Sequence, residues 1–142
     1  MAVGDLANAE RAQQHHDELA KTVLAIESDS GGFAPRGFDT GSKDPAASKR
    51  LTTHVGDAAS LLRALGVRKV SEGHGGADIG PMEAAGVPMI GLDVDNRTYF
   101  DIHHTEADTL DKVDPAQLAD NLAAVAVLAY VIADLPDRID AP

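Results

Sequence analysis

Apolar residues recur along this chain with two different spacings, and each spacing predicts a different kind of element. Short apolar runs rich in β-branched residues predict three buried strands, at residues 22–26, 67–70 and 87–92. Apolar residues three or four positions apart predict two helices, over residues 48–65 and 115–135. Gly66 ends the first helix, Asp114 caps the second, and Pro136 ends it.

Weaker patterns fill the rest of the chain. A polar, Ala-rich stretch without a helix breaker predicts a helix over residues 7–19, and Pro81 begins a short helix that Gly86 ends. The other segments are predicted loops, at residues 33–43, 72–80 and 93–104, the last with an extended stretch at 98–100. Strands that alternate with helices indicate an α/β fold, a three-layer sandwich with a mainly parallel sheet.

Length and composition are typical of one folded domain. The chain has 142 residues, of which 44% are hydrophobic and 25% charged. A hydrophobic share of this size is enough to form a buried core, and two separate cores would not fit this length. We therefore expect a single domain over residues 1–142.

The chain is strongly acidic. It has 12 Lys and Arg against 23 Asp and Glu, a net charge of −11, which excludes nucleic acid as a partner because phosphate binding needs the opposite sign. Residues 93–142 hold most of this charge, and their acids lie among apolar residues. We therefore expect a solvated face or a cation site there rather than a disordered tail. Cysteine is absent, so any metal must be bound by His, Asp or Glu.

No segment predicts targeting or membrane insertion. The first six residues lack a basic region followed by an apolar run. The longest apolar stretch, residues 122–133, is shorter than the roughly 20 residues of a membrane span. We interpret it as part of a buried helix and expect a soluble chain with no membrane partner, whose compartment the sequence does not reveal.

Polar clusters follow all three predicted strands, at residues 27–29, 74–78 and 93–108. Ligands of α/β proteins bind beyond the carboxyl ends of the strands, so these clusters are expected to converge on one site. Each cluster also has a purely structural interpretation. Asp29 precedes Ser-Gly-Gly and suits a turn, and Asp78 suits a cap for the short helix.

The six histidines differ in what they suggest. His74 in a glycine-rich loop, the pair at residues 15–16 on a polar helix, and His54 are typical of solvent-exposed surface. The pair His103 and His104 is more suggestive of a site. Because neighbours in an extended segment point in opposite directions, only one of the two is expected to face a given metal.

Three strings together resemble the C-terminal half of a two-zinc exopeptidase: AIESDSG (25–31), GGADIGP (75–81) and YFDIHHTEADT (99–109). The family is metallopeptidase family twenty-eight, which includes bacterial leucine aminopeptidases and carboxypeptidases. Order and spacing match over about residues 4–136, nearly the whole chain. The resemblance implies hydrolysis of peptide bonds by a water that two zinc ions activate, with a glutamate as general base.

The resemblance also assigns roles to individual residues. Asp29 matches the aspartate that binds one zinc ion, and His104 matches the histidine that binds the other. His103 and Asp78 match positions that line the substrate pocket of the family.

Two motifs of the family are not found in this chain. The family has a His-x-Asp motif, whose Asp bridges the metals, and a Glu-Glu pair, which contains the general base and a further ligand. The chain has no Glu-Glu pair, and its His15-His16-Asp17 lies on the predicted first helix. Two of five expected ligands are present, whereas a zinc site needs three or four. We expect no catalytic residue in this chain, weak or absent zinc binding, and no peptidase activity of the chain alone.

Three interpretations stay open. The chain is part of a zinc exopeptidase that is active only with its other half, or it is a non-catalytic peptidase-like module for binding or oligomerisation. A third possibility is adventitious binding of another divalent cation by the acidic segment. A lone half of the family's sheet would leave a strand edge and an apolar helix surface uncovered. The expected partner is a second copy of the chain, most simply in a dimer, or a complementing N-terminal half, with a peptide as substrate.

Overall fold

The structure is a computed structural model that describes residues 15–141. Four strands and several helices alternate along the chain, where η denotes a 3-10 helix. In order they are α2 (His16–Leu19), β1 (Ala25–Glu27), β2 (Pro35–Gly41), α3 (Pro45–Ala59), η1 (Ser60–Leu65), β3 (Lys69–Glu72), η2 (Gly80–Ala85), β4 (Met89–Val94), η3 (Asn96–Thr98), α4 (Tyr99–Ile102), η4 (Leu110–Lys112) and α5 (Pro115–Ala133). Of the predicted first helix, the part before residue 15 lies outside the described residues, and α2 is its end.

The four strands form one sheet in the order β1-β4-β2-β3. The pairs β1/β4 and β2/β3 are parallel, and β2/β4 is antiparallel. The predicted α/β fold with a mainly parallel sheet is therefore confirmed. The antiparallel pair has a consequence for the site, because β3 ends at the opposite end of the sheet from β1 and β4.

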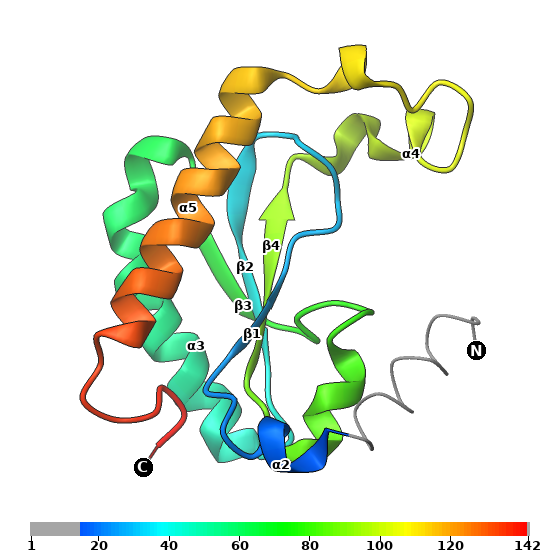
Figure 1. Ribbon diagram of the computed structural model, residues 1–142. Helices are drawn as coiled ribbons and strands as arrows, with labels where there is room; N and C mark the ends of the chain where they lie inside the picture. Colours follow the sequence, from blue (N-terminus) through cyan, green and yellow to red (C-terminus); the bar gives the residue numbers. More distant parts are fainter. Residues whose placement is uncertain (1–14, 142) are drawn as a thin grey trace.

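The sheet lies between two layers, as expected for a sandwich. Helices α3 and α5 cover one face (Figure 1), where Phe38, Leu51, Ile90 and Leu128 are fully buried in the main core. On the other face α2 and η2 pack on Met89, which points away from the main core because it neighbours Ile90 in the strand.

Strand β2 corrects the prediction of a loop over residues 33–43. Its glycines and its single proline suit a central strand for local reasons. Pro35 is the first residue of the strand, where a missing N–H matters least. A Cβ on Gly37 would clash with the backbone carbonyl oxygen of Lys69, so only glycine allows β2 and β3 to approach this closely. Composition alone therefore suggests a loop at a place where two neighbouring strands approach each other closely.

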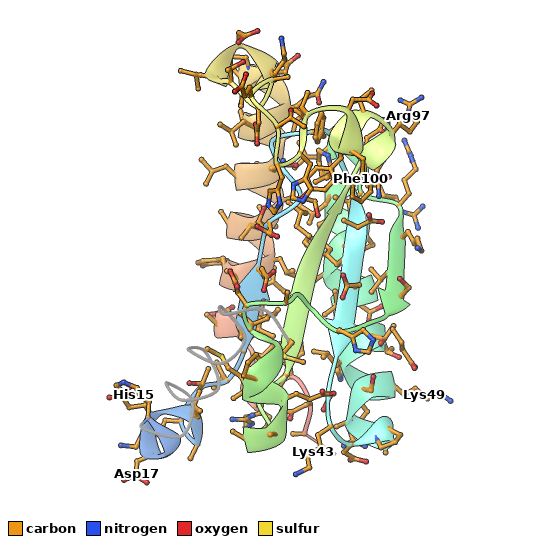
Figure 2. The ribbon with its side chains drawn as sticks, turned by 90° about the vertical axis from the view of Figure 1, so that its right-hand side faces the viewer. His15, Asp17, Lys43, Lys49, Arg97 and Phe100 are labelled. Atoms are coloured by element: carbon orange, nitrogen blue, oxygen red, sulfur yellow. The ribbon has the colours of Figure 1, made fainter. Side chains whose placement is uncertain are left out.

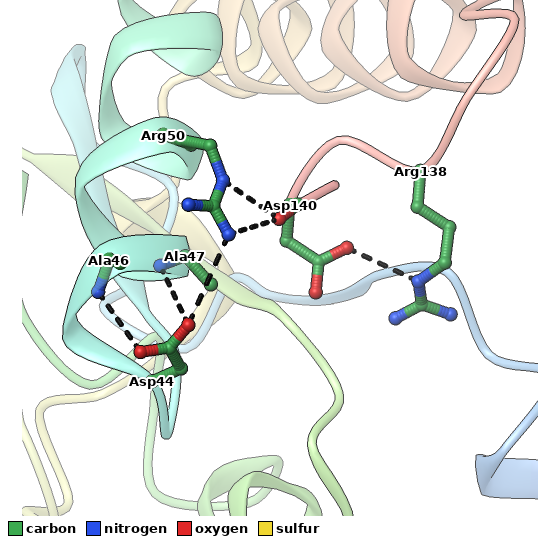
Figure 3. Close-up of polar contacts among 6 residues, drawn as sticks. All are labelled: Asp44, Ala46, Ala47, Arg50, Arg138 and Asp140. Carbon is green, nitrogen blue, oxygen red and sulfur yellow. Dashed lines mark hydrogen bonds and ion pairs between the residues drawn. The ribbon is translucent and has the colours of Figure 1, made fainter. Parts of the chain in front are cut away.

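Helix α3 begins three residues before the predicted start. The carboxylate of Asp44 accepts hydrogen bonds from the N–H groups of Ala46 and Ala47, and this cap defines the helix start (Figure 3). The guanidinium of Arg50 donates to the carbonyl oxygen of Asp140 at 3.0 and 3.1 Å, and Arg138 pairs with the Asp140 carboxylate. The two bonds from Arg50 hold the segment after α5 against α3. The helix is followed directly by η1, which Gly66 ends at φ 98° as predicted.

Helix α5 has the predicted cap at Asp114 and ends two residues before the predicted end. It is buried along one side only. Leu122 is 70% exposed, so the interpretation of residues 122–133 as a buried helix is wrong for the outer side. Among the described residues, α5 is the one helix that is long and apolar enough to cross a membrane by length and composition, which alone is weak evidence for a span.

Two predicted strand segments also differ from the structure. Residues 22–24 precede β1 rather than belonging to it, because pairing with β4 begins at Ala25. Residues 98–100 are helical instead of extended, since η3 continues directly into α4.

Candidate functional site

Two of the three polar clusters meet at one end of the sheet. Strands β1 and β4 are parallel, so the segments that follow them emerge side by side. Between these segments and the chain around η4 lies a pocket of about 270 Å³. Its walls include Asp29, Phe33, Tyr99, His103, His104 and Asp108. Asp29 and His104, which come from distant parts of the sequence, thus face one cavity.

The loop after β1 is shaped by glycine and by an aromatic contact. Gly31 has φ 82°, a left-handed conformation in which a side chain would be strained. The ring of Phe33 then contacts the ring of Tyr99 edge to face, with centroids 6.5 Å apart. This contact joins the loop that carries Asp29 to helix α4, which leads to the histidines.

The two histidines do not point in opposite directions as predicted. Their rings stack with centroids 3.8 Å apart and planes 26° apart, and Tyr99 stacks on the other side of His103 at 4.4 Å. The backbone explains the difference, because His104 has φ 57° and the segment is a turn rather than an extended strand. A left-handed conformation is strained for a histidine, and such strain gathers at functional sites.

The electrostatics of the pocket are dominated by carboxylates. Burial raises the pKa of the Tyr99 hydroxyl, and the negative charges of Asp29 and Asp108 raise it further. Tyr99 therefore stays protonated, as a hydrogen-bond donor beside two carboxylates. Lys112, which also lines the pocket, pairs with Asp111 at 2.8 Å and, with Thr109, lowers the Asp111 pKa to about 2.

Asp78 and His74 do not line this pocket. They follow β3, whose end lies at the other end of the sheet, and their loop crosses the face opposite α3. The carboxylate of Glu27 accepts hydrogen bonds from the N–H groups of Ala77, Asp78 and Ile79, at 2.9–3.1 Å. The middle cluster therefore contacts the first one through Glu27, although neither Asp78 nor His74 lines the pocket of Asp29 and His104. The residue directly before η2 is Ile79, so Asp78 lies one position further from the helix start than predicted.

The donors in the pocket match zinc in type and fall short in number. Asp29 supplies a carboxylate and His104 an imidazole, both common zinc ligands. No group of three or more His, Asp or Glu side chains that could hold a metal ion occurs within residues 15–141. The described residues thus fit part of a zinc site and do not complete one.

The sequence patterns do not reveal the aromatic residues of this site. Phe33 falls in a predicted loop, and Tyr99 falls in a predicted extended stretch. The one available signal is rarity, since only 4% of the chain is aromatic and both residues lie close in sequence to candidate polar residues. That signal is too general to identify a pocket wall.

Comparison with known proteins gives a consistent picture. Residues 5–129 match the model of the family described as Peptidase family M28. Carboxypeptidase Q of Rattus norvegicus is 34% identical over 137 residues, which cover 96% of this chain and 28% of that protein. Carboxypeptidase Q of Homo sapiens is also 34% identical, over 89% of this chain and 26% of that protein.

A solved structure shows the same fold. The crystal structure of a peptidase M28 precursor from Shewanella amazonensis SB2B superposes with a TM-score of 0.82 at 36% identity. The match covers 95% of this chain and 30% of that one. This chain therefore spans less than a third of the length of the relatives and of the solved structure that it matches.

Proposed function

We propose that this chain, which belongs to peptidase family M28, forms part of the catalytic domain of a zinc-dependent exopeptidase, with Asp29 and His104 as metal ligands. The observation that carries this proposal is that both side chains line one pocket although they come from distant parts of the sequence. Each residue follows a strand of the parallel pair β1/β4, which is where ligands bind in α/β sheets.

The remaining residues of the pocket suit a peptide substrate. Zinc, when bound, would activate a water and polarise the peptide carbonyl. Phe33 and Tyr99 provide an apolar wall of the pocket. The ring of His103 stacks between those of Tyr99 and His104, and this limits the rotation of the Tyr99 and His104 rings. We propose that His103 contacts the substrate there. Asp78 does not line this pocket, but its N–H donates to Glu27, two residues before Asp29, and we propose that Asp78 contacts the substrate from that loop.

The chain alone is proposed to be inactive. Two carboxylates and two imidazoles line the pocket, but no three of the described His, Asp or Glu side chains form a group that could hold a metal ion, and the sequence has no Glu-Glu pair to supply a general base. A purified chain should release no amino acid from dipeptides at any zinc concentration. Turnover that disappears in His104→Ala would show instead that the chain carries a complete catalytic site.

Metal binding at the pocket is tested with Co²⁺ as a paramagnetic substitute for zinc. With so few ligands the affinity is low, and NMR line broadening detects low-affinity sites. Broadening should be strongest around residues 29–33 and 103–108 and be lost in Asp29→Asn and in His104→Gln. The matched control is His54→Gln, since His54 is an exposed histidine on α3. Broadening centred on residues 134–140, or broadening that is unchanged in His104→Gln, would mean adventitious binding by acidic side chains outside the pocket.

The proposed partner covers β1 and the outer side of α5. Strand β1 is at the edge of the described sheet, and Leu118, Leu122 and Tyr130 on α5 are at least 49% exposed. A helix that is apolar on all sides is normally covered on all sides. Either a complementing N-terminal half or, for the chain alone, a second copy would cover this surface.

The self-association of the isolated chain is measured by sedimentation velocity at micromolar concentration. The wild-type chain is expected to be a dimer, and Leu122→Glu is expected to be a monomer. Leu61→Glu is the matched control, because Leu61 is 68% exposed but lies on η1 rather than on α5. A wild-type chain that sediments as a monomer would contradict the second copy as partner.

A second candidate function is a non-catalytic peptidase-like module. The observation that favours it is the lack of a group of three metal ligands within residues 15–141. The discriminating experiment adds a separately expressed N-terminal portion of a family member that has the His-x-Asp and Glu-Glu motifs. Peptidase activity that depends on His104 supports the enzyme, and a complex without activity supports the module.

A further inference from the structure

A second cavity, of about 500 Å³, lies beside the candidate zinc pocket and shares Phe33 with it. The residues that line it include Phe33, Arg36, Asp95, Arg97, Thr98 and Gln117. It sits at the end of the molecule where β4 finishes. Figure 2 shows Arg97 and Phe100 together at this end, with Lys43 at the other.

Two arginines converge on one carboxylate in this cavity. Arg36, from the start of β2, donates from its terminal NH2 group to Oδ2 of Asp95 at 2.7 Å. Arg97, from η3, donates from Nε to Oδ1 at 2.7 Å and from NH2 to Oδ2 at 2.6 Å. The guanidinium planes are thus held by Asp95, which is itself fixed by its N–H bond to the carbonyl oxygen of Ala34.

The cluster has a surplus of charge and of donors. Two guanidiniums and one carboxylate leave one positive charge uncompensated, in a chain whose net charge is −11. Only part of each guanidinium is used on Asp95, and much of the rest is open to solvent, since Arg36 and Arg97 are 49% and 82% exposed. The two arginines hold the pKa of Asp95 well below its ordinary value, so this arrangement is charged at all physiological pH values.

The shape of the donors selects the anion. A guanidinium binds a planar carboxylate through two parallel N–H bonds. The surplus of one positive charge matches a monoanion better than a phosphate dianion. The aromatic ring of Phe33 at the boundary of the two cavities offers an apolar contact between the anion site and the candidate zinc pocket.

We propose that Arg36 and Arg97 bind the free C-terminal carboxylate of a peptide substrate. This inference rests on the proposed function, because an exopeptidase must recognise a chain terminus next to the bond that it cleaves. The substrate would extend from the pocket of Asp29 and His104, past Phe33, to the two arginines. The site would therefore favour short peptides with an unblocked C-terminus and exclude peptide amides.

The test uses the metal-free chain and one matched pair of probes, N-acetyl-alanyl-phenylalanine and its C-terminal amide. Each is titrated into ¹⁵N-labelled protein while the arginine Nε–Hε signals are followed by NMR. The acid should shift the Arg36 and Arg97 signals to saturation and bind about tenfold more tightly than the amide, as expected for a charge-assisted pair.

Variants show which arginines the preference for the acid depends on. Arg97→Gln and Arg36→Gln should each abolish the preference for the acid. Arg138→Gln is the matched control, because Arg138 also pairs with an aspartate, Asp140, but lines a different cavity. Equal binding of acid and amide by the wild-type chain, or a preference that survives Arg97→Gln, would overturn the proposal. Arg97 is largely exposed, so this variant is expected to fold, which its thermal unfolding checks.

Failure of this inference is distinct from failure of the proposed function. The titration contains no metal and does not involve Asp29 or His104. If the metal-free chain shows no preference for the acid, while the separate experiment shows Co²⁺ bound at the pocket, only the carboxylate site is refuted. An acid preference in a chain whose pocket binds no Co²⁺ would support the carboxylate site and contradict the zinc-ligand assignment.

Discussion

Asn121 on α5 is a buried polar residue whose replacement should stabilise the protein. It is 4% exposed and faces the core between α5 and the sheet, on the same side of the helix as Ala124 and Leu128. Neither its Oδ1 nor its Nδ2 atom has a hydrogen-bond partner among the described residues. The perturbation is Asn121→Leu, which has the same side-chain branching, a somewhat larger volume and no polar atoms.

The expected gain follows from three contributions. Each buried polar group without a partner costs about 1–3 kcal/mol, and Asn121 has two. Leucine is also the better helix former, by a few tenths of a kcal/mol. Because the branched leucine is wider than asparagine, packing strain offsets about 1–3 kcal/mol of this gain. The net expectation is about 1–3 kcal/mol of added stability, or about 4 °C in Tm per kcal/mol for a chain of this size.

The assay is urea unfolding monitored by circular dichroism, at two protein concentrations so that self-association is recognised. Asn121→Ala should gain less than Asn121→Leu because it leaves a void, and the isosteric Asn121→Asp should lose several kcal/mol through a buried charge. The reasoning is refuted if Asn121→Leu destabilises the protein by more than about 1 kcal/mol, since the amide must then have a partner.

Further predictions concern the glycines and the ion pairs. Gly76→Ala should destabilise the protein by about 1–3 kcal/mol, because Gly76 has φ 150° and a Cβ there would clash with the Glu27 carboxylate. Gly56 lies on α3 with open space around it, so Gly56→Ala should stabilise the protein by about 0.5–1 kcal/mol. The urea unfolding midpoints of the two variants test both predictions. The pair Lys112–Asp111 should contribute to stability only above acidic pH: the folded-state pKa of Asp111 is lowered from 3.8 to about 2, so its contribution is present above pH 3.8 and is lost as the pH falls towards 2. The difference in urea midpoint between wild type and Asp111→Asn should therefore be larger at about pH 5 than at about pH 3, and an equal difference at both would contradict the lowered pKa. The same sign holds for Asp95, whose pKa is lowered by Arg97 and Arg36, and its contribution should also shrink in roughly 1 M salt because both arginines are largely exposed.

The ends of several helices could be predicted from local signals. Asp114 with Pro115 at the first helical position, and Gly66 at a helix end, act through the backbone of their own neighbourhood, and the structure has both as predicted. Strand β2 could not be predicted this way. Gly37 is required by the carbonyl group of Lys69, which lies beyond the whole of α3 and η1 in the sequence, and no local pattern contains that information.

The candidate site could be predicted in part, as far as it depends on the order of strands and polar residues along the chain. Asp29 and His104 lie in polar segments that follow predicted strands, which makes them candidate site residues. The parallel pairing of β1 with β4 then brings these two segments together. The stacking of His103 on His104 was not predictable, because it depends on the left-handed backbone of a single residue. Arg36 and Arg97 lie on elements far apart in the sequence and meet only through Asp95, so no spacing marks them.

The position of β1 in the sheet determines when the candidate site forms during folding. This short strand pairs only with β4 within the described sheet, and β2, α3 and β3 all come between the two in the sequence. The strands β2 and β3 are closer in sequence and are separated mainly by the helical segment α3 and η1, so they are expected to associate first. Asp29 would then reach its place late in folding and leave it early when the native state fluctuates. The amides of residues 25–27 should exchange with solvent sooner than those of β2, and the pocket would be lost before the core unfolds.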